Sequence, residues 1–259
     1  MSEFSKEMRA EEVLFRYAKG VSSRRGREFH PYHEIILFLG ERATLYSEAG
    51  HMSISPGTLI VIPKETYHQL NIEGLPQSYH RCVLHFPDLP ALGEVIGRSM
   101  TALFVTPVGE ETSFLFQKLI RTLDTEASES VRALVLRSVL PLLLSEIRRE
   151  GEDFRPQLHP IVKESLSYIG NHLTEPLTVE HLARELRVSA SLLAHTFKRE
   201  MNISIYRYIL KKRLTAAAHR IGSGEPAVTV AAECGFSDYS NFYRQYKKTF
   251  GSSPSKRKE

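Results

Sequence analysis

Residues 230–242 read VAAECGFSDYSNF, and this stretch predicts how the end of the chain folds. Small and apolar residues lead into Cys234-Gly235-Phe236, a glycine-containing turn, and the pair Ser237-Asp238 can then cap a further helix. We therefore expect a short helix at 228–233, a tight turn, and a second helix from about 238 to 249. Two short helices joined in this way are typical of a helix-turn-helix.

Another unit of the same type lies earlier in the chain. We call this earlier one the first unit and the one at residues 228–249 the second unit. Thr178 can cap a helix at 179–185, and Ser189 can cap a helix that ends at Glu200 after the turn 186–188. Ser189 and Ser237 lie 48 positions apart and hold equivalent places in the two units. A long helix at 204–221 with Ser204 as its cap should connect them. One more helix is expected earlier, with an apolar face formed by Val162, Leu166, Ile169 and Leu173 and an end at Pro176.

The charge of the chain is divided unevenly. Residues 160–259 hold 16 Lys and Arg against 9 Asp and Glu, a net charge of +7, while the first 159 residues have a net charge of −3. A basic half favours binding to a polyanion, and in a helix-turn-helix the second helix enters the major groove of DNA. The stretch from Leu182 to Ala217, and then residues 230–254, resemble the AraC/XylS family of bacterial transcription regulators. This resemblance covers about residues 160–254.

The spacing within each second helix separates inward from outward side chains. Leu193 and Phe197 in the first unit, and Phe242 and Tyr246 in the second, are four residues apart and should face the core. Arg244 can bind a guanine through two hydrogen bonds or contact a phosphate instead, and Asn241 can bind an adenine. The second helix of the first unit, in which the direction of Leu192 is ambiguous, offers weaker contacts. Lys198, Lys247 and Lys248 are equally well explained as phosphate contacts or as solvated charge. The predicted DNA-binding residues are Ser189, Ser191, Leu192, Ala194, His195, Lys198, Ser237, Tyr239, Ser240, Asn241, Tyr243, Arg244, Lys247 and Lys248.

Short strands separated by Gly and Pro fill residues 27–86, which favours an antiparallel barrel or sandwich. With the C-terminal resemblance in mind, this region looks like the cupin-type sensory barrel of the same family. Small barrels can enclose one small ligand, and polar groups that point inward would bind it. The candidate effector-binding residues are His30, His33, Glu34, His68, Arg81 and His85.

A metal site is the competing interpretation of these histidines, because His and Glu are common ligands for transition metals. The spacing of His30, His33 and Glu34 differs from the close His-x-His pair of metal-binding cupins. Strand alternation also puts His30 and His33 on opposite faces unless a bulge intervenes. We therefore expect no bound metal and no cofactor, and each histidine taken singly can also be a structural residue with satisfied hydrogen bonds.

From residue 111 the apolar period becomes helical, through Phe114, Leu119, Leu134 and Leu142, with a kink or restart expected at Pro141. This connector either packs on its own barrel or forms a dimer interface. The expected architecture is α+β and multidomain: a cupin-like antiparallel β-barrel, a helical connector, and an all-α domain with two helix-turn-helix units. The expected boundaries are 1–110 for the sensory barrel, 111–150 for the connector, 151–159 for the linker and 160–259 for the DNA-binding domain.

The sequence thus predicts a DNA-binding transcription regulator, expected to be an activator, rather than an enzyme. Its expected partners are promoter DNA, a small polar effector such as a sugar, a second copy of the chain and RNA polymerase. Two alternatives stay open: a metal-dependent cupin-fold enzyme with a helical appendage, and a regulator whose barrel binds no effector. No signal peptide, no apolar run of membrane-spanning length and no cysteine cluster are visible, which predicts a cytoplasmic location.

Overall fold

The computed structural model describes residues 4–20, 29–72, 79–100, 102–150 and 158–254. The chain divides into two compact units, Met1–Pro156 and Gln157–Glu259. Most of the predicted linker, residues 151–157, lies outside the described residues. Within the described parts of the chain, no helix has the length and apolar character needed to cross a membrane.

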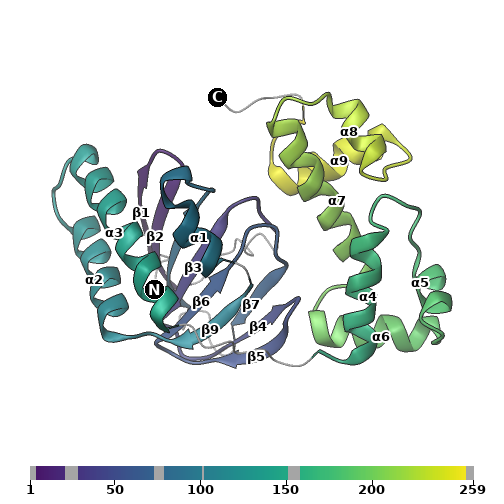
Figure 1. Ribbon diagram of the computed structural model, residues 1–259, viewed down its shortest axis with the longest axis horizontal. Coiled ribbons are helices and arrows are strands. Elements are labelled where there is room, and N and C mark those ends of the chain that lie inside the picture. Colours follow the sequence, from purple (N-terminus) through teal and green to yellow (C-terminus); the bar gives the residue numbers. More distant parts are fainter. Residues whose placement is uncertain (1–3, 21–28, 73–78, 101, 151–157, 255–259) are drawn as a thin grey trace. The chain divides into compact units, whose positions relative to one another are not determined.

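The N-terminal unit contains two antiparallel sheets (Figure 1). The larger has the order β1-β2-β8-β3-β6-β9 and the smaller the order β5-β4-β7. Among the described residues no strand pairing joins the two sheets, so closure into a single barrel is not seen. The strands are β1 (Phe4–Ala10), β2 (Val13–Lys19), β3 (His33–Phe38), β4 (Ala43–Ser47), β5 (Gly50–Ile54), β6 (Thr58–Ile62), β7 (His68–Ile72), β8 (His80–Phe86) and β9 (Phe104–Pro107).

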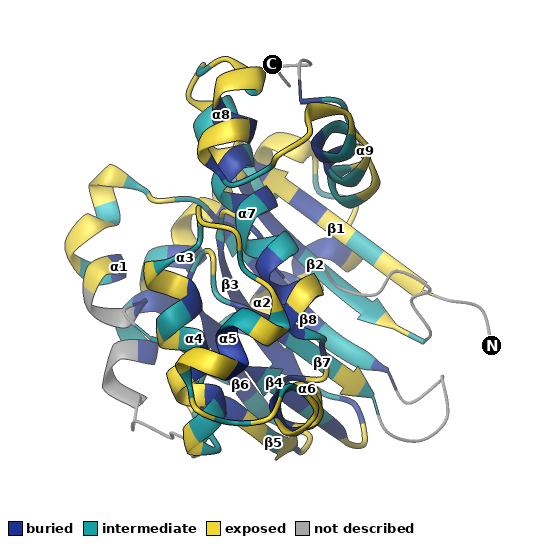
Figure 2. Cartoon of the chain, turned by 90° about the vertical axis from the view of Figure 1, so that its right-hand side faces the viewer, coloured by how far each residue is buried: buried dark blue, intermediate teal, exposed yellow. Residues whose placement is uncertain are grey.

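The alternating side chains of the large sheet serve two separate cores, because successive residues of a strand point to opposite faces. On β3, Ile35 and Leu37 belong to a core that includes side chains of two long helices. Ile36 and Phe38 belong to a second core shared with the small sheet. All six residues of β3 are buried, as expected for a central strand with both faces covered (Figure 2).

Two long helices cover one face of the large sheet: α2 (Glu110–Asp124) and α3 (Glu129–Glu150), preceded by the short α1 (Gly93–Ser99). Of the two outcomes predicted at Pro141, the restart is wrong, since α3 continues through that residue, and the kink stays a prediction. Leu140, Leu143 and Leu144 are buried on either side of the proline. We infer that their packing offsets the cost of a proline inside a helix, about 3 kcal/mol for the lost hydrogen bond and the clash of the ring with the preceding turn.

The C-terminal unit is helical in every element of its described residues. Its helices are α4 (Pro160–Asn171), α5 (Val179–Glu185), α6 (Ala190–Met201), α7 (Ile205–Gly222), α8 (Ala227–Glu233) and α9 (Tyr239–Phe250). These bounds agree with the expected helices to within one or two residues, apart from α4, which ends before Leu173. The α4 helix stops five residues before Pro176, and His172 is its C-terminal cap.

Candidate functional site

The predicted capping residues start the helices of both helix-turn-helix units. The hydroxyl oxygen of Thr178 accepts a hydrogen bond from the backbone N–H of His181, and that of Ser189 from Leu192. In the second unit the cap is Asp238, whose carboxylate accepts from the N–H groups of Ser240 and Asn241. Ser237, which the sequence also offered as a cap, lies just outside the helix. The negative charge of a carboxylate at this position also interacts favourably with the positive end of the helix dipole.

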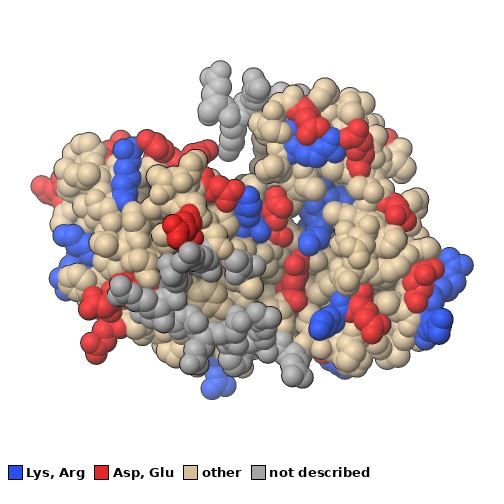
Figure 3. All heavy atoms as spheres, in the orientation of Figure 1, with Lys and Arg blue, Asp and Glu red and all other residues tan. Residues whose placement is uncertain are grey.

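Each second helix has one buried face and one exposed face. Leu193, Phe197 and Phe242 are fully buried, and Tyr246 is 8% exposed, as the spacing predicts. Leu192, whose direction the sequence left open, is 49% exposed. Of the predicted DNA-binding residues, Asn241 and Tyr243 are half-buried and the others are exposed. In the view of Figure 3, basic and acidic side chains are interspersed over the helical unit rather than gathered by sign.

Arg213 on α7 joins the two helix-turn-helix units, and sequence reasoning did not assign it a role. Its Nε donates to the carbonyl of Leu173 at 2.8 Å and its Nη1 to that of Gly235 at 2.9 Å. Its Nη2 donates to the carbonyl of Glu175 at 2.5 Å. One guanidinium therefore ties the loop before the first unit to the turn of the second.

Gly235 completes this junction. Its φ is +82°, and a Cβ on it would lie 2.8 Å from the carbonyl oxygen of Thr174 and 2.9 Å from Cζ of Arg213. Both the backbone conformation and the close approach require glycine. The turn of the second unit therefore packs directly on the loop of the first, and α7 is not their only connection.

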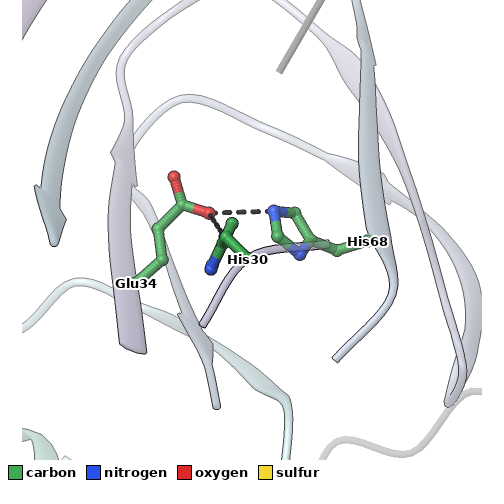
Figure 4. A group of neighbouring side chains, drawn as sticks. All are labelled: His30, Glu34 and His68. Carbon is green, nitrogen blue, oxygen red and sulfur yellow. Dashed lines mark hydrogen bonds and ion pairs between the residues drawn. The ribbon is translucent and has the colours of Figure 1, made fainter. Parts of the chain in front are cut away.

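In the N-terminal unit, three imidazoles surround one buried carboxylate. Nε2 of His30 lies 3.0 Å from Oε2 of Glu34, and Nε2 of His68 lies 2.8 Å from the same oxygen (Figure 4). Nε2 of His85 lies 2.9 Å from Oε1 of Glu34. The four residues come from the segment before β3, from β3 itself, and from β7 and β8, so both sheets contribute. We call these four residues the histidine–glutamate cluster.

Burial and these contacts act on the cluster in opposite directions. Burial lowers the pKa of His30 and outweighs the contact with Glu34, so the neutral ring is favoured. Burial alone would raise the pKa of Glu34, but its contacts with the three imidazoles hold that pKa well below the usual range. Glu34 is therefore ionised although only 5% of it is exposed.

The other two predicted effector-binding residues lie apart from the carboxylate. His33 is directed differently: its Nε2 contacts Asp88 at 3.0 Å, and its Nδ1 accepts from the backbone N–H of Lys64. Arg81 stacks on Tyr79, and its Nε is buried without a hydrogen-bond partner among the described residues. On β8, Arg81 and His85 are four residues apart and therefore share the face toward the small sheet.

Comparison with known proteins finds a matching domain model and several similar proteins. Residues 182–259 match a model described as a helix-turn-helix domain. The chain is 26% identical over 231 residues to the probable transcriptional regulator LumQ of Photobacterium leiognathi, covering 88% of this chain and 89% of that protein. It is 27% identical over 196 residues to the arabinose operon regulatory protein of Escherichia coli K12, covering 74% of this chain and 64% of that protein. The matched model and these relatives support an AraC/XylS-family transcriptional regulator.

A solved structure similar to this chain is the C-terminal domain of AraT, a response regulator from Geobacillus stearothermophilus. It has 30% sequence identity and a TM-score of 0.38, and the match covers 40% of this chain and 92% of that one. The two curated relatives are named as regulators. The helix-turn-helix match and these relatives support a DNA-binding regulator of transcription, and the relatives do not favour the alternative of an enzyme.

Proposed function

We propose that the helical unit binds double-stranded promoter DNA by inserting α6 and α9 into two successive segments of the major groove. The observation that carries this proposal is the exposed face of each capped second helix, opposite a face buried in the unit. In a helix-turn-helix the N-terminal residues of the second helix contact the edges of the bases. The junction at Arg213 supports a fixed arrangement of the two helices, as two groove segments about 34 Å apart would require.

The two helices contribute differently in this proposal. On α9, Arg244 and Asn241 carry the groups that bind guanine and adenine through paired hydrogen bonds, and each such pair discriminates by about 1–3 kcal/mol. On α6, Ser191 and His195 offer single hydrogen bonds, and Ala194 offers a methyl contact to thymine. The second unit therefore supplies most of the sequence specificity, and the first supplies affinity.

The salt dependence of binding by the full-length protein tests this proposal. DNA fragments that the protein enriches from genomic DNA serve as ligands, and their affinity is measured from about 50 to 200 mM salt. A log–log slope of about −0.9 for each neutralised phosphate is expected. The variant Lys247→Ala should lower the slope by about one, whereas Arg121→Ala, at an exposed position of α2, should not change it. A salt-independent interaction would contradict the proposal, and equal slopes for all three proteins would show that Lys247 is solvated charge rather than a phosphate contact.

The connector helices α2 and α3 support a dimer. Their outer surface carries four exposed apolar side chains: Phe114 (62% exposed), Val131 (47%), Leu134 (64%) and Leu142 (54%). On α3 the spacing of Val131, Leu134 and Leu142 puts them along one side of the helix. We call these four residues the connector stripe. Water-exposed apolar stripes of this kind favour association with a matching surface, here a second copy of the chain.

The N-terminal unit is proposed to bind a small polar effector that alters promoter binding or activation, with RNA polymerase as the further partner of an activator. A relative is named for the arabinose operon, which supports a sugar as one class of effector. The histidine–glutamate cluster supplies polar groups inside an otherwise apolar interior. Titration of candidate sugars with thermal unfolding as readout tests this, because a ligand of the folded form raises the melting temperature. Unchanged melting with every candidate would favour a regulator without an effector.

A further inference from the structure

The histidine–glutamate cluster has more hydrogen-bond acceptors than the N–H groups of neutral His30 and His68 can satisfy. Nδ1 of His30 faces the carbonyl oxygen of Tyr32 at 2.8 Å, and Nδ1 of His68 faces that of Thr66 at 3.1 Å. The Nε2 atoms of the same two rings face Oε2 of Glu34. Both nitrogens of both rings therefore meet acceptors, whereas a neutral imidazole has only one N–H to donate.

The nearby His33 has one hydrogen-bond donor and one acceptor facing its two ring nitrogens. Its Nδ1 accepts a hydrogen bond from the N–H of Lys64, and its Nε2 contacts the carboxylate of Asp88. One acceptor and one donor satisfy a neutral ring completely. His30 and His68 lack such a donor. If each gives its Nδ1 proton to the backbone carbonyl, two bare Nε2 lone pairs converge on a carboxylate oxygen.

We propose that His30, Glu34 and His68 bind a divalent first-row transition-metal ion through Nε2, Oε2 and Nε2. A cation between these atoms converts three opposed lone pairs into ligands and keeps both Nδ1–H groups on their carbonyl partners. Hydrogen bonding of the second ring nitrogen to a backbone carbonyl is the usual way in which ligand histidines are oriented. The proposal deepens the effector site proposed above and rests on it for the ion's role, while ion binding itself is tested without DNA.

The geometry fits an ion with little rearrangement. The candidate ligand atoms of the three residues all lie within 4.8 Å of one another. Each Nε2 atom lies 2.8–3.0 Å from Oε2. Ligands about 2.0–2.1 Å from an ion lie about 3.0 Å apart when adjacent in an octahedron and about 3.4 Å apart in a tetrahedron. The two Nε2–Oε2 distances therefore match adjacent positions of an octahedron, and for a tetrahedron they would lengthen by a few tenths of an ångström.

His85 acts as a supporting residue in this proposal. Its Nε2 lies 2.9 Å from Oε1, the other oxygen of Glu34, and so holds the carboxylate in orientation. Three protein ligands leave coordination positions for water or for an oxygen atom of a polar effector. Strand alternation had counted against a metal here, but that argument concerned His30 with His33. His30 precedes β3 and contacts Glu34 from the loop, so the alternation of the strand does not apply to it.

The test uses untagged full-length protein that has been stripped with a chelator and then freed of it. Zn²⁺ and Co²⁺ are titrated separately against a chromophoric chelator, and the visible absorption of Co²⁺ reports its coordination. One ion per chain is expected. His68→Gln and Glu34→Gln should weaken binding at least 100-fold, and His85→Gln should weaken it about tenfold because the ligands themselves remain. His33→Gln, a buried histidine of the same strand with its own carboxylate partner, is the matched control and should bind as the unaltered protein does.

The outcomes separate this proposal from the regulatory one. Absence of a retained ion, or equal affinities of His33→Gln and His68→Gln, overturns the metal site. Far-UV circular dichroism of each ion-free variant verifies that it folds. If His68→Gln does not fold, His85→Gln, which retains all three proposed ligands, takes its place in the comparison. DNA binding of the same preparations is measured in parallel, so failure to bind DNA contradicts the proposed function and leaves the metal result standing.

Discussion

Single residues decide which contacts the second helix-turn-helix can offer. Asp238 satisfies two backbone N–H groups at the start of α9, and that start is where base contacts are made. One turn later along the exposed face, Arg244 follows Asn241 by three residues, so the two side chains are neighbours on the helix surface. Lys248 lies one further turn along, and we expect it to contact the phosphate backbone rather than the bases.

Arg244→Ala and Lys248→Ala should therefore differ in kind. Loss of a paired contact to guanine should remove about 1–3 kcal/mol of discrimination at one base position and leave other positions unchanged. Loss of a phosphate contact should weaken all sequences alike and reduce the salt slope by about one. Competition binding on a series of sites with single base changes measures both. If Arg244→Ala weakens every site equally, Arg244 is a phosphate contact.

At the scale of elements, packing determines which apolar residues of the connector stay outside. On α2, Phe116 and Leu119 are buried against the sheet, while Phe114 faces solvent. On α3, Leu136 and Leu140 are buried and Leu134 is exposed. The helices thus use one face for their own core and leave the connector stripe for another surface. The two interpretations of this segment, core packing and dimer interface, apply to opposite faces of the same helices.

Leu134→Glu should weaken self-association at least tenfold and leave the fold intact, because 64% of this side chain is already exposed. Sedimentation equilibrium over a range of protein concentrations measures the effect. Val228→Glu serves as the control, since Val228 is 63% exposed but belongs to α8 in the other unit. Dimers of unchanged stability in Leu134→Glu would exclude the connector stripe as the interface.

At the scale of the whole molecule, the two units have separate cores. The cores of the N-terminal unit contain residues of the sheets and of α1 to α3, and a further core joins α7, α8 and α9 around Phe242. Units with independent cores can unfold independently, which suits a regulator in which one part binds an effector and another binds DNA.

Phe242→Ala should accordingly lower one of two calorimetric transitions and leave the other in place. Removal of a fully buried phenylalanine costs about 3–5 kcal/mol, enough to unfold a marginally stable helical unit. Differential scanning calorimetry of the full-length protein, compared with Phe4→Ala at an exposed site of β1, checks this. A single transition that moves as a whole would show that the units unfold together.

The sequence alone was enough for the helical unit, because its signals are local. Thr178, Ser189 and Ser204 cap helices at the predicted positions, and the four-residue spacing of Phe242 and Tyr246 identifies a buried face. The strands β1 and β2 were not predicted, because their alternation is weak. They form a hairpin that joins the sheet through β8, which is distant from β2 in sequence.

Only the tertiary structure decided the two junctions on which function is proposed to depend. Pairing of β3 with β8 brings His85 to Glu34, and packing of the small sheet against the large one brings His68 there. The adjacent His33 contacts Asp88 instead. Arg213 likewise contacts the carbonyls of Leu173 and Gly235 only after both helix-turn-helix units have packed. Caps and helical periodicity act within a few residues of the chain, whereas these contacts exist only where separate segments meet.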